Sequence, residues 1–540
     1  MHGRELIRAA MTLQDVERVP WTPFVGVHGG ALIGVNAADY LRSADHIVNG
    51  LTKAVELYRP DGLPIVFDLQ LEAEILGCRL EWAAENPPAV VSHPLAEGRT
   101  LDELALPNAD DGRLPIVLEA ARRLRQQFPD LALYGLVTGP FTLALHLLGT
   151  EIFMKMMLEP EAVKELFAFT QQVAEHMADL YIDSGADVIA VVDPMTSQIG
   201  PDLFRQFVSE PATAIFAHIR SRGALGSFFV CGHAQQNIEA MCECRPDNIS
   251  VDENIPLDYV REISLSRGVS FGGNLQLTVV LLLGSEKDVR RHVVETLDIG
   301  GERGFILAPG CDLPYRTPIA NLRAVAELVH DPYQREVART LGSSGDVCEV
   351  WDMSDYGKSD RVIVDIITLD SEACAPCQYM VESVKAVAPQ FKDIVVWREH
   401  KIKHSESVQF MTSLMVKNIP TICIDGKITF VSRIPPKEEL IAAIQRRINE
   451  KLLFKIRSRK GALYLFGKTE EELAPLEEIV RRALRETGAD IDLIKSCNPE
   501  EMHKFGVALT PAAVLAVYKI KAEGTVPQVA AVKEWIKEII

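Results

Sequence analysis

The chain lacks several features that define large classes of protein. It has no basic excess: 75 acidic residues outnumber 56 basic ones, for a formal net charge of -19 at pH 7. Such a charge repels nucleic-acid phosphates and anionic membrane surfaces, so we expect neither as a partner. No uncharged apolar stretch reaches the roughly 18 residues of a membrane span. The first residues indicate an amphipathic helix rather than a signal peptide. We therefore expect a soluble, cytoplasmic protein.

Cysteine is also scarce, and its spacing is irregular. The 540 residues include ten cysteines, of which one pair, Cys374 and Cys377, has Cys-x-x-Cys spacing. This usage suits metal or redox chemistry in a reducing compartment better than a disulfide framework. A chain of this length is too long for one hydrophobic core, and three domains are expected.

The first 340 residues alternate apolar, strand-like runs with amphipathic helical segments. A helix is predicted over residues 161–183, where apolar residues recur at helical spacing, and Gly185 then precedes a strand. Eight such strand–helix units predict a (β/α)8 TIM barrel over residues 1–340, in the α/β class. The predicted strands are residues 20–27, 62–68, 132–138, 187–193, 226–232, 248–252, 269–273 and 304–308.

The remaining chain has a different pattern. A polar, glycine- and serine-containing stretch at residues 342–360 indicates a domain boundary. Two similar α/β blocks follow, at residues 358–450 and 458–540, each with strand–helix–strand–helix order and then a hairpin and a last helix. The predicted strands are residues 361–368, 394–398, 421–424 and 428–431 in the first block, and 462–466, 490–494, 513–517 and 519–523 in the second.

Two cysteines 80 residues apart are the first candidates for a functional site. Cys231 and Cys311 each end a short apolar run, where a barrel strand would emerge into a loop. Active sites of barrel enzymes lie at this rim. Together with His233, the two thiols would make a suitable set of zinc ligands. The alternative is that both are buried structural cysteines.

Other polar residues fall at the same predicted rim. Asp68 and Asp193 end strands and are candidates to orient substrate, or else to cap helices and brace loops. Asn274 has the same two interpretations. His28, in a glycine-rich loop after the first strand, is a candidate for the mouth of the pocket. His146 lies on an apolar helix and is either a cofactor contact or a core histidine.

The Cys-x-x-Cys pair follows a strand and opens a helix. Cys374 would lie at the helix N-terminus, where backbone N–H groups stabilise a thiolate, and Cys377 would be the buried resolving cysteine. With Pro420 in an Ile-Pro-Thr sequence, the block resembles thioredoxin folds, and the resemblance implies a cis Pro420, a redox-active disulfide and a redox partner. The second block resembles thioredoxin-like proteins in residues 504–511 and 523–527. It has no cysteine at residues 466–471, where the active pair would stand.

The barrel segments resemble the uroporphyrinogen decarboxylase superfamily. The matching stretches are residues 66–68, 138–144, 185–194, 204–211, 273–275 and 308–318. Decarboxylases of this family resemble one another in an arginine-rich loop after the first strand, which binds the substrate's acidic side chains. Residues 24–30 contain no arginine, so a carboxy-lyase is the weaker alternative.

A second branch, the methylcobamide:thiol methyltransferases, matches better. Their motif resembles this chain at Cys231-Gly232 and at Cys311, while Phe229 stands at the family's histidine position and His233 is the substitute. The resemblance implies a corrinoid-dependent methyltransferase that moves a methyl group from a methylcobamide to a small thiol, with zinc holding the thiolate. No Asp-x-His-x-x-Gly carrier motif is present, which implies a separate corrinoid protein. The alternative is a thiol-disulfide oxidoreductase whose barrel is a binding module.

Overall fold

The computed structural model describes residues 1–340, 356, 361–372, 374–416, 418–458, 462–487 and 491–516. The chain divides into two compact units, Met1–Leu440 and Ile441–Ile540. The first unit contains a large parallel sheet and a smaller mixed sheet, and the second contains a three-stranded sheet. The predicted boundary at residues 342–360 lies outside the described residues, apart from Tyr356.

The first unit is built on a parallel barrel. An isolated parallel bridge between Trp21 and Leu307 links the chain before β1 to the last strand, and the Asp61 N–H donates to the Trp21 carbonyl, so the two edges of the sheet are joined. This confirms the predicted barrel fold. Its strands, in spatial order, are β1 (Gly62–Pro64), β4 (Ala132–Thr138), β5 (Val188–Val192), β6 (Leu225–Val230), β7 (Asn248–Val251), β8 (Ser270–Leu275) and β9 (Phe305–Pro309).

Two of the eight predicted strands are shorter than expected. Residues 20–27 form only the bridge at Trp21, because Pro20 and Pro23 have no N–H to donate to a neighbouring strand. The strand predicted at residues 62–68 ends at Pro64. The other six predictions are confirmed to within two residues at each end.

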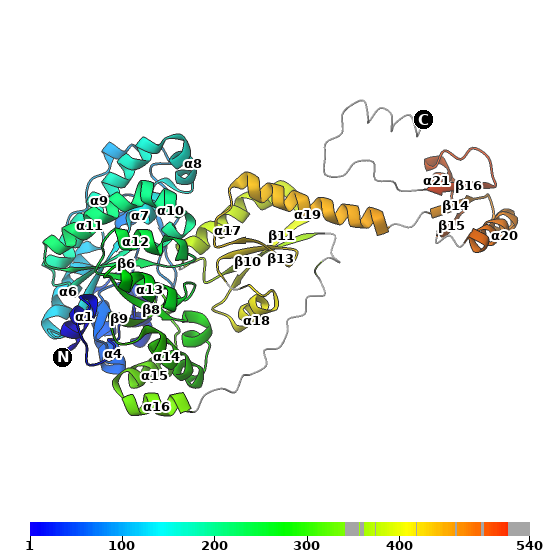
Figure 1. Cartoon of the computed structure of the whole chain (residues 1–540). Coiled ribbons are helices and arrows are strands. Elements are labelled where there is room, and N and C mark those ends of the chain that lie inside the picture. Colours follow the sequence, from blue (N-terminus) through cyan, green and yellow to red (C-terminus); the bar gives the residue numbers. More distant parts are fainter. Residues whose placement is uncertain are drawn as a thin grey trace. The chain divides into compact units, whose positions relative to one another are not determined.

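Helices cover the barrel, as Figure 1 shows. The predicted helix over residues 161–183 is α9, which starts at Pro160. The helices are α1 (Gly3–Met11), α2 (His28–Leu32), α3 (Ala37–Tyr40), α4 (Ala44–Tyr58), α5 (Leu71–Ile75), α6 (Leu114–Gln127), α7 (Pro140–Leu148), α8 (Glu151–Leu158), α9 (Pro160–Asp183), α10 (Pro201–Leu203), α11 (Ser209–Ser221), α12 (Ile238–Glu243), α13 (Leu257–Ser266), α14 (Glu286–Gly300), α15 (Ile319–His330) and α16 (Pro332–Thr340). Shorter 3-10 or π turns are η1 (Leu101–Glu103), η2 (Pro194–Gln198), η3 (Phe204–Val208), η4 (Gln235–Asn237) and η5 (Leu277–Leu282).

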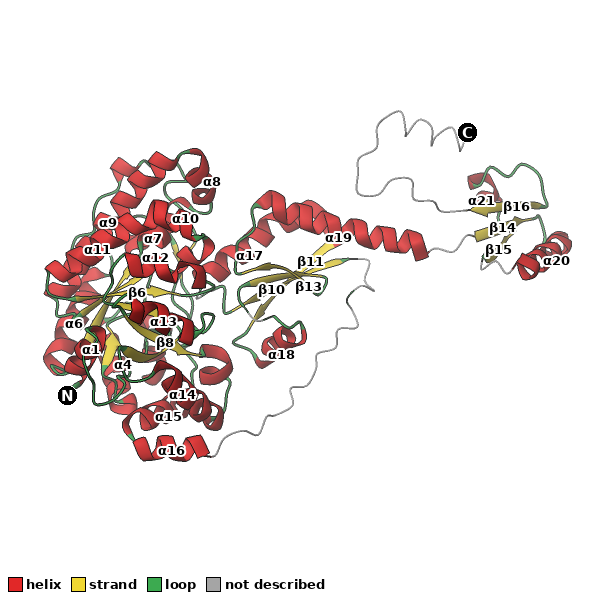
Figure 2. Cartoon of the chain, in the orientation of Figure 1, coloured by secondary structure: helices red, strands yellow, loops and turns green. Residues whose placement is uncertain are grey.

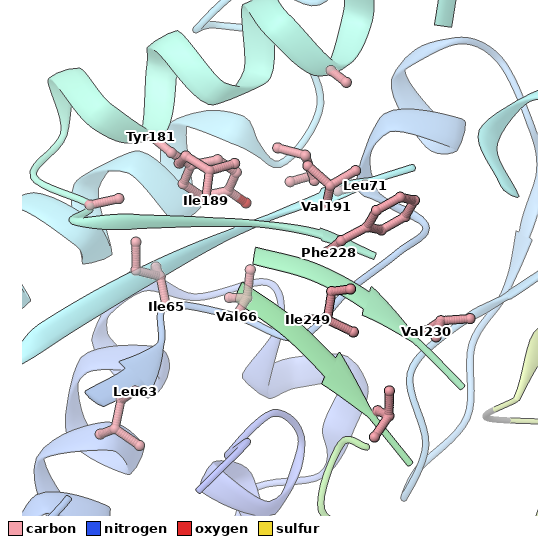
Figure 3. Packing of buried hydrophobic residues seen from close by; sticks show 14 of the residues in the cluster. Leu63, Ile65, Val66, Leu71, Tyr181, Ile189, Val191, Phe228, Val230 and Ile249 are labelled. Carbon is pink, nitrogen blue, oxygen red and sulfur yellow. The ribbon is translucent and has the colours of Figure 1, made fainter. Parts of the chain in front are cut away.

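Successive residues of each barrel strand enter two different cores. In β6, Phe228 and Val230 belong to the cluster between sheet and helices, together with Tyr181 of α9 (Figure 3). Phe229 belongs to the cluster inside the barrel. Because side chains alternate along a strand, Cys231, the next residue after Val230, continues the inward-facing series. The pleat of β6 therefore directs Cys231 toward the barrel mouth.

Within the described residues, no single helix combines the length and apolarity of a membrane span; the bent pair α7 and α8 meets the criterion by length and composition only.

A mixed sheet of order β11-β10-β12-β13 completes the first unit, and Figure 2 shows its strands beside the helix α17. Strands β10 and β11 are parallel, and the other pairs are antiparallel. The Ile419–Pro420 peptide bond is cis, as predicted. The elements of this domain are β10 (Val362–Thr368), α17 (Ala375–Val387), η6 (Ala388–Ile394), β11 (Val395–Lys401), α18 (Ser405–Ser413), β12 (Thr421–Ile424) and β13 (Lys427–Val431). Helix α19 (Lys437–Ser458) follows and runs from the first unit into the second. In the barrel, β2 (Leu80–Glu81) and β3 (Ala89–Val90) form a separate hairpin.

The sheet of the second unit has the same strand directions as β11, β10 and β12 of the mixed sheet, with one parallel and one antiparallel pair. Strand β14 pairs in parallel with β15 and antiparallel with β16, and the Thr510–Pro511 bond is cis. The strand predicted at residues 519–523 lies outside the described residues. The elements are β14 (Ala462–Phe466), α20 (Glu470–Thr487), β15 (Asp492–Ser496), α21 (Pro499–Lys504) and β16 (Ala512–Ala516). The parallel barrel sheet, the mixed sheet and the three-stranded sheet each fall within one of the three predicted domains. The exact limits of these domains stay predictions.

Candidate active site

A cavity of about 120 Å³ lies at the carboxyl ends of the barrel strands, between the barrel loops and the mixed sheet of the same unit. Both pairs of predicted reactive cysteines line it. The barrel contributes Val27, Phe67, Leu69, Gln70, Glu85, Asn86, Pro87, Val192, Pro194, Cys231, Gly232, Asp252, Glu253, Asn254, Leu277, Thr278, Cys311, Asp312, Leu313, Pro314 and Tyr315. The mixed-sheet domain contributes Leu369, Asp370, Cys374, Ala375, Pro376, Cys377, Lys403, Ile419 and Pro420.

The two barrel thiols meet as the sequence suggested. Cys231 follows β6 and Cys311 follows β9, and Cys231 Sγ donates to Cys311 Sγ at 3.1 Å. Burial, followed by the contact with Cys311, raises the pKa of Cys231 well above its usual range. For Cys311 the hydrogen bond from Cys231 lowers the pKa, but burial and the nearby Asp312 carboxyl outweigh it and the net direction is upward. Without a metal or another cation, these shifts favour protonated thiols over thiolates.

Three aromatic rings lie beneath the thiols, inside the barrel. Phe229 meets Phe24 edge-on at 5.4 Å between ring centroids and Phe67 at 5.9 Å. Phe229 occupies the position two residues before Cys231, where the resembling methyltransferases carry histidine. In this chain an apolar aromatic contact replaces a nitrogen ligand there.

His233 is not brought to the thiol pair. It does not line the cavity, and its Nδ1 is buried without a hydrogen-bond partner. The backbone turns at Gly232, whose φ is 85°, so the alternation that directs Cys231 inward does not continue to His233. Among the described residues, no group of three or more His, Cys, Asp or Glu side chains is arranged to hold a metal. The predicted Cys231–His233–Cys311 ligand set is thus not assembled in this structure.

Carboxyl groups surround the thiols instead. Asp252, after β7, accepts from the N–H of Gly232 at 2.6 Å and so supports the turn after Cys231. Glu253 Oε1 accepts from the Leu277 N–H at 3.1 Å, whereas Glu253 Oε2 is buried and has no hydrogen-bond partner. Burial, and then the neighbouring Asp252, raises the pKa of Glu253. Because a Cβ added at Gly310 would lie 2.1 Å from Glu253 Oε2, this free oxygen lies against the residue that precedes Cys311.

The Cys-x-x-Cys pair enters the cavity from the opposite side. Cys374 is the N-cap residue of α17, as predicted, and Cys377 lies in the first turn with 1% of its surface exposed. The hydrogen bond with Cys377 and then burial raise the pKa of Cys374 well above its usual range. The backbone N–H of Cys377, in the first turn of α17, lowers the pKa of Cys374 as the helix-terminus expectation requires, but the Cys377 thiol and burial outweigh it.

The two predicted catalytic aspartates are braces. Asp193 caps α7: its carboxylate accepts from the N–H groups of Phe141 and Thr142, at 3.1 and 2.8 Å, and from the Thr142 hydroxyl. Asp68 accepts from Arg113 Nη1 at 2.5 Å and from the Gln70 N–H at 2.9 Å. Neither aspartate lines the cavity. The carboxylate oxygens of both residues accept hydrogen bonds that hold a loop or a helix end in place. This agrees with the alternative interpretation, in which the two aspartates cap helices and brace loops.

The three predicted cofactor contacts also lie outside the cavity lining. His28 has both ring nitrogens engaged, with the Tyr315 carbonyl at 3.0 Å and the Tyr58 hydroxyl at 2.8 Å. His146 is a buried core histidine, and burial lowers its pKa to about 3. Asn274 Nδ2 donates to the carbonyls of Asp252 and Ile255 and so braces the loop after β7. These roles for the three residues are structural.

Sequence reasoning missed Glu253, Asp312 and Lys403. Glu253 and Asp312 are found by the same rim rule that selected Cys231, because each follows shortly after a parallel strand. Lys403 pairs with Asp370 at 2.5 Å and reaches the cavity from the mixed-sheet domain, a position that depends on how the domains meet.

Two family models match the chain. The uroporphyrinogen decarboxylase (URO-D) family matches residues 2–332, which include the whole barrel. A thioredoxin domain model matches residues 474–537, within the second unit. The thioredoxin match does not include the Cys374–Cys377 pair, whose block only resembles a thioredoxin fold in its strand order, helix position and cis Pro420.

The curated relatives include both methyltransferases and decarboxylases. The methylcobamide:CoM methyltransferase MtbA of Methanosarcina acetivorans is 26% identical over 271 residues, which cover 49% of this chain and 78% of the relative. The MtaA enzyme of Methanosarcina barkeri is 29% identical over 283 residues, covering 50% and 81%. A uroporphyrinogen decarboxylase of a Wolbachia species is 24% identical over 296 residues, covering 53% and 82%.

The barrel fold is shared with a solved methyltransferase from Methanosarcina mazei. That structure matches with a TM-score of 0.58 and 23% identity, covering 62% of this chain and 99% of the other. The family match extends over more than half of the chain, includes every barrel strand and agrees with this fold. The chain therefore belongs to the uroporphyrinogen decarboxylase family.

Proposed function

We propose that the protein is a methyltransferase that moves a methyl group from a methylcobamide to a thiol-type acceptor. The observation that carries the proposal is the convergence of Cys231 and Cys311, 3.1 Å apart, in the cavity at the barrel mouth. The names of the methylcobamide:CoM methyltransferases support the donor and the type of acceptor. Since the chain has no carrier motif of its own, we infer that the corrinoid is supplied by a separate protein.

The chemistry requires a nucleophilic sulfur. A methyl group on cobalt is attacked by a thiolate, whereas a free alkyl thiol is mostly protonated at neutral pH. The cavity walls are apolar in part, from Phe67, Val192 and Leu277. Cys231 and Cys311 would fix where the acceptor sulfur is held. Soft thiolate ligands of this kind select zinc over harder cations.

Among the described residues, no third side chain completes a zinc site with Cys231 and Cys311 in this arrangement, so zinc binding would require side chains to move. In a tetrahedral site with zinc–sulfur bonds of 2.3 Å, two sulfurs stand about 3.8 Å apart, so Cys231 and Cys311 would need to separate by under 1 Å. The unpartnered Glu253 Oε2, buried in the same cavity against Gly310, is the donor available in place of His233. We infer that zinc would be held by Cys231, Cys311 and Glu253. When bound, it would supply a Lewis acid that deprotonates the acceptor thiol.

Replacing Glu253 tests the ligand set directly. In Glu253→Gln we expect zinc affinity to fall by about tenfold or more, because one anionic oxygen donor becomes a neutral amide. Competitive titration of the full chain against a zinc chelator measures it. Glu295→Gln, on the exposed face of α14, is the control and should retain the parent affinity. Equal affinities in Glu253→Gln and the parent would remove Glu253 from the site.

The charged side chains that line the cavity limit which acceptor thiols can bind there. Five lining side chains are carboxylic acids: Glu85, Asp252, Glu253, Asp312 and Asp370. Among the described lining residues, Lys403 is the only cation, and it is paired with Asp370. Such a lining disfavours polyanions, which argues against the carboxy-lyase alternative and its acidic tetrapyrrole. We propose a small neutral or cationic thiol as acceptor.

The direct test of this function is demethylation of free methylcobalamin by the zinc-loaded full chain. We expect the cobalt–carbon absorbance to disappear only when a thiol is added, and a neutral thiol to react faster than a sulfonated one of the same length. Absence of methylated thiol by mass spectrometry across such a panel would reject the proposal.

The redox alternative is favoured by a separate observation, namely the Cys374–Cys377 pair at the N-terminus of α17. An oxidoreductase that acts on external proteins needs its first cysteine open to the partner. Here Cys374 faces the barrel cavity instead. The pair therefore fits an internal substrate better than an external one.

A further inference from the structure

Four cysteines from distant parts of the sequence face one cavity. Cys231 and Cys311 enter it from the barrel, and Cys374 and Cys377 from the mixed-sheet domain. Methyl transfer uses only the barrel pair, so a second dithiol in the same enclosed space requires its own explanation.

The sulfur atoms of Cys231 and Cys311 are close enough for a disulfide bond to form after a small movement. The two sulfurs are 3.1 Å apart, and a disulfide bond is about 2.05 Å long. An approach of about 1 Å would join them, which loops at strand ends can accommodate. Because the same two sulfurs define the acceptor site, their oxidation would destroy it.

The domain that carries Cys374 is held over the mouth by polar contacts on several sides. Gln378 Nε2, one residue after Cys377, donates to the Val90 carbonyl at 2.7 Å. Asn86 Nδ2, on the loop between β2 and β3, donates to Glu372 Oε2 at 3.0 Å.

On another side of the cavity, one glutamine makes two contacts with the segment after β13. Gln198 Nε2 donates to the Ser432 carbonyl at 3.0 Å, and the Ile434 N–H donates to Gln198 Oε1 at 2.8 Å.

Apolar packing reinforces this placement. Tyr379, one turn into α17, has 1% of its surface exposed and belongs to the barrel's outer core cluster. Its ring stacks with that of His93 at 6.1 Å between centroids. Leu369 and Ala375 pack against the same cluster. The Cys-x-x-Cys helix is thus seated on the barrel, and the face that a thioredoxin-like domain presents to its substrate is turned toward Cys231 and Cys311.

We propose that the substrate of the Cys374–Cys377 dithiol is the disulfide of the same chain's Cys231 and Cys311. The disulfide arises when a peroxide or another two-electron thiol oxidant removes two electrons and two protons from the barrel pair. Cys374 thiolate attacks one barrel sulfur, which forms a mixed disulfide and releases the other barrel sulfur as a thiolate. Cys377 thiolate then attacks Cys374 Sγ and releases the second barrel sulfur. The barrel pair ends reduced and Cys374–Cys377 ends oxidised, with no net change in electrons or protons; an external dithiol restores the latter.

This proposal rests on the sulfur geometry and not on methyl transfer. If the chain exchanges these disulfides but does not demethylate methylcobalamin, the proposed methyltransferase function is refuted and the proposed disulfide exchange is supported. Conversely, active methyl transfer without exchange would refute only the exchange.

Trapping the mixed disulfide is the first test. The metal-free, reduced full chain is oxidised with hydrogen peroxide, alkylated in acid and mapped by mass spectrometry without reduction. In Cys377→Ser we expect a covalent link from Cys374 to Cys231 or Cys311, because the resolving thiol is gone. Cys423→Ser removes a buried thiol of β12 that does not line the cavity, and it should give the parent's Cys374–Cys377 disulfide. A persistent Cys231–Cys311 disulfide with no link to Cys374 would overturn the proposal.

Reduction kinetics provide a second measurement that does not depend on the Cys377 variant. With about 1 mM dithiothreitol, we expect the Cys231–Cys311 disulfide to be reduced about tenfold or more slowly in Cys374→Ser than in the parent or Cys423→Ser, because the tethered thiol has a high effective concentration. Equal rates in the three proteins would show that Cys374 does not reach the barrel pair.

Discussion

Cys311→Ala is expected to lower the rate of methylcobalamin demethylation by about 100-fold or more, since a catalytic metal centre supplies several kcal/mol of stabilisation and each 1.36 kcal/mol is tenfold in rate. Cys231→Ala should have an equal effect, because the two sulfurs hold one site, 3.1 Å apart. The double variant should be no slower than either single one, as for residues that act as a unit. Stopped-flow absorbance with zinc and a neutral thiol in excess measures all three.

The matched control is Cys244→Ala. Cys244 is a buried barrel thiol just after α12, outside the cavity lining, and its Sγ donates to the backbone carbonyls of Ser209 and Ala240. Its loss should leave the rate within about twofold, because only packing changes. Strictly additive losses in the double variant, or an active Cys311→Ala, would show that the thiols do not form one catalytic centre.

Arg113→Leu is expected to destabilise the first unit by about 3–5 kcal/mol, because it leaves buried carboxylates without their cation. Arg113 lies before α6 and bonds Asp68 at 2.5 Å and Glu74 at 2.7 Å. The Arg113 side chain is 7% exposed and that of Asp68 is 1% exposed. Urea unfolding monitored by tryptophan fluorescence measures the loss, with the first transition assigned to this unit.

Arg123→Leu, ten residues further along the chain in α6, is the control for removing an arginine. It pairs with Asp45 and Glu119 on the surface, where all three side chains are at least 38% exposed. Exposed ion pairs contribute about 0–1 kcal/mol, so the unfolding midpoint should scarcely move. If both variants lost the same stability, the loss would reflect a property of α6 and not the buried network at Asp68.

Much of the fold follows from local sequence patterns. Strands such as β5 and β9 are continuous apolar runs because parallel barrel strands are buried on both faces, and such runs can be located without knowledge of their neighbours. The prediction of a full strand over residues 20–27 was wrong, because Pro20 and Pro23 limit the pairing of this segment to one bridge at Trp21. The thioredoxin-like order of β10 to β13 was likewise evident from the helix opened by Cys374 and from the proline loop at Pro420.

The roles of the rim residues were harder to predict. Asp193, Asn274 and His28 all follow or end strands, which is also where reactive residues lie. What separates a brace from a reactive group is its hydrogen-bond partner, and those partners are distant in sequence: Thr142 for Asp193 and Tyr315 for His28. A single sequence records no such pairing, so Asp193 and Glu253 could not be told apart until the lone pairs of each were assigned.

By itself, the sequence determined the barrel, the thioredoxin-like pattern and the two cysteines that would meet at the mouth. Each depends on periodicity, or on the rule that parallel strands end at one rim, and both are properties of short segments. Only the tertiary structure decided that His233 turns away at Gly232, that Glu253 keeps a free oxygen, and that Cys374 faces Cys231 and Cys311. These outcomes depend on how loops fold and domains dock, and the contacts that direct them join residues up to 288 positions apart.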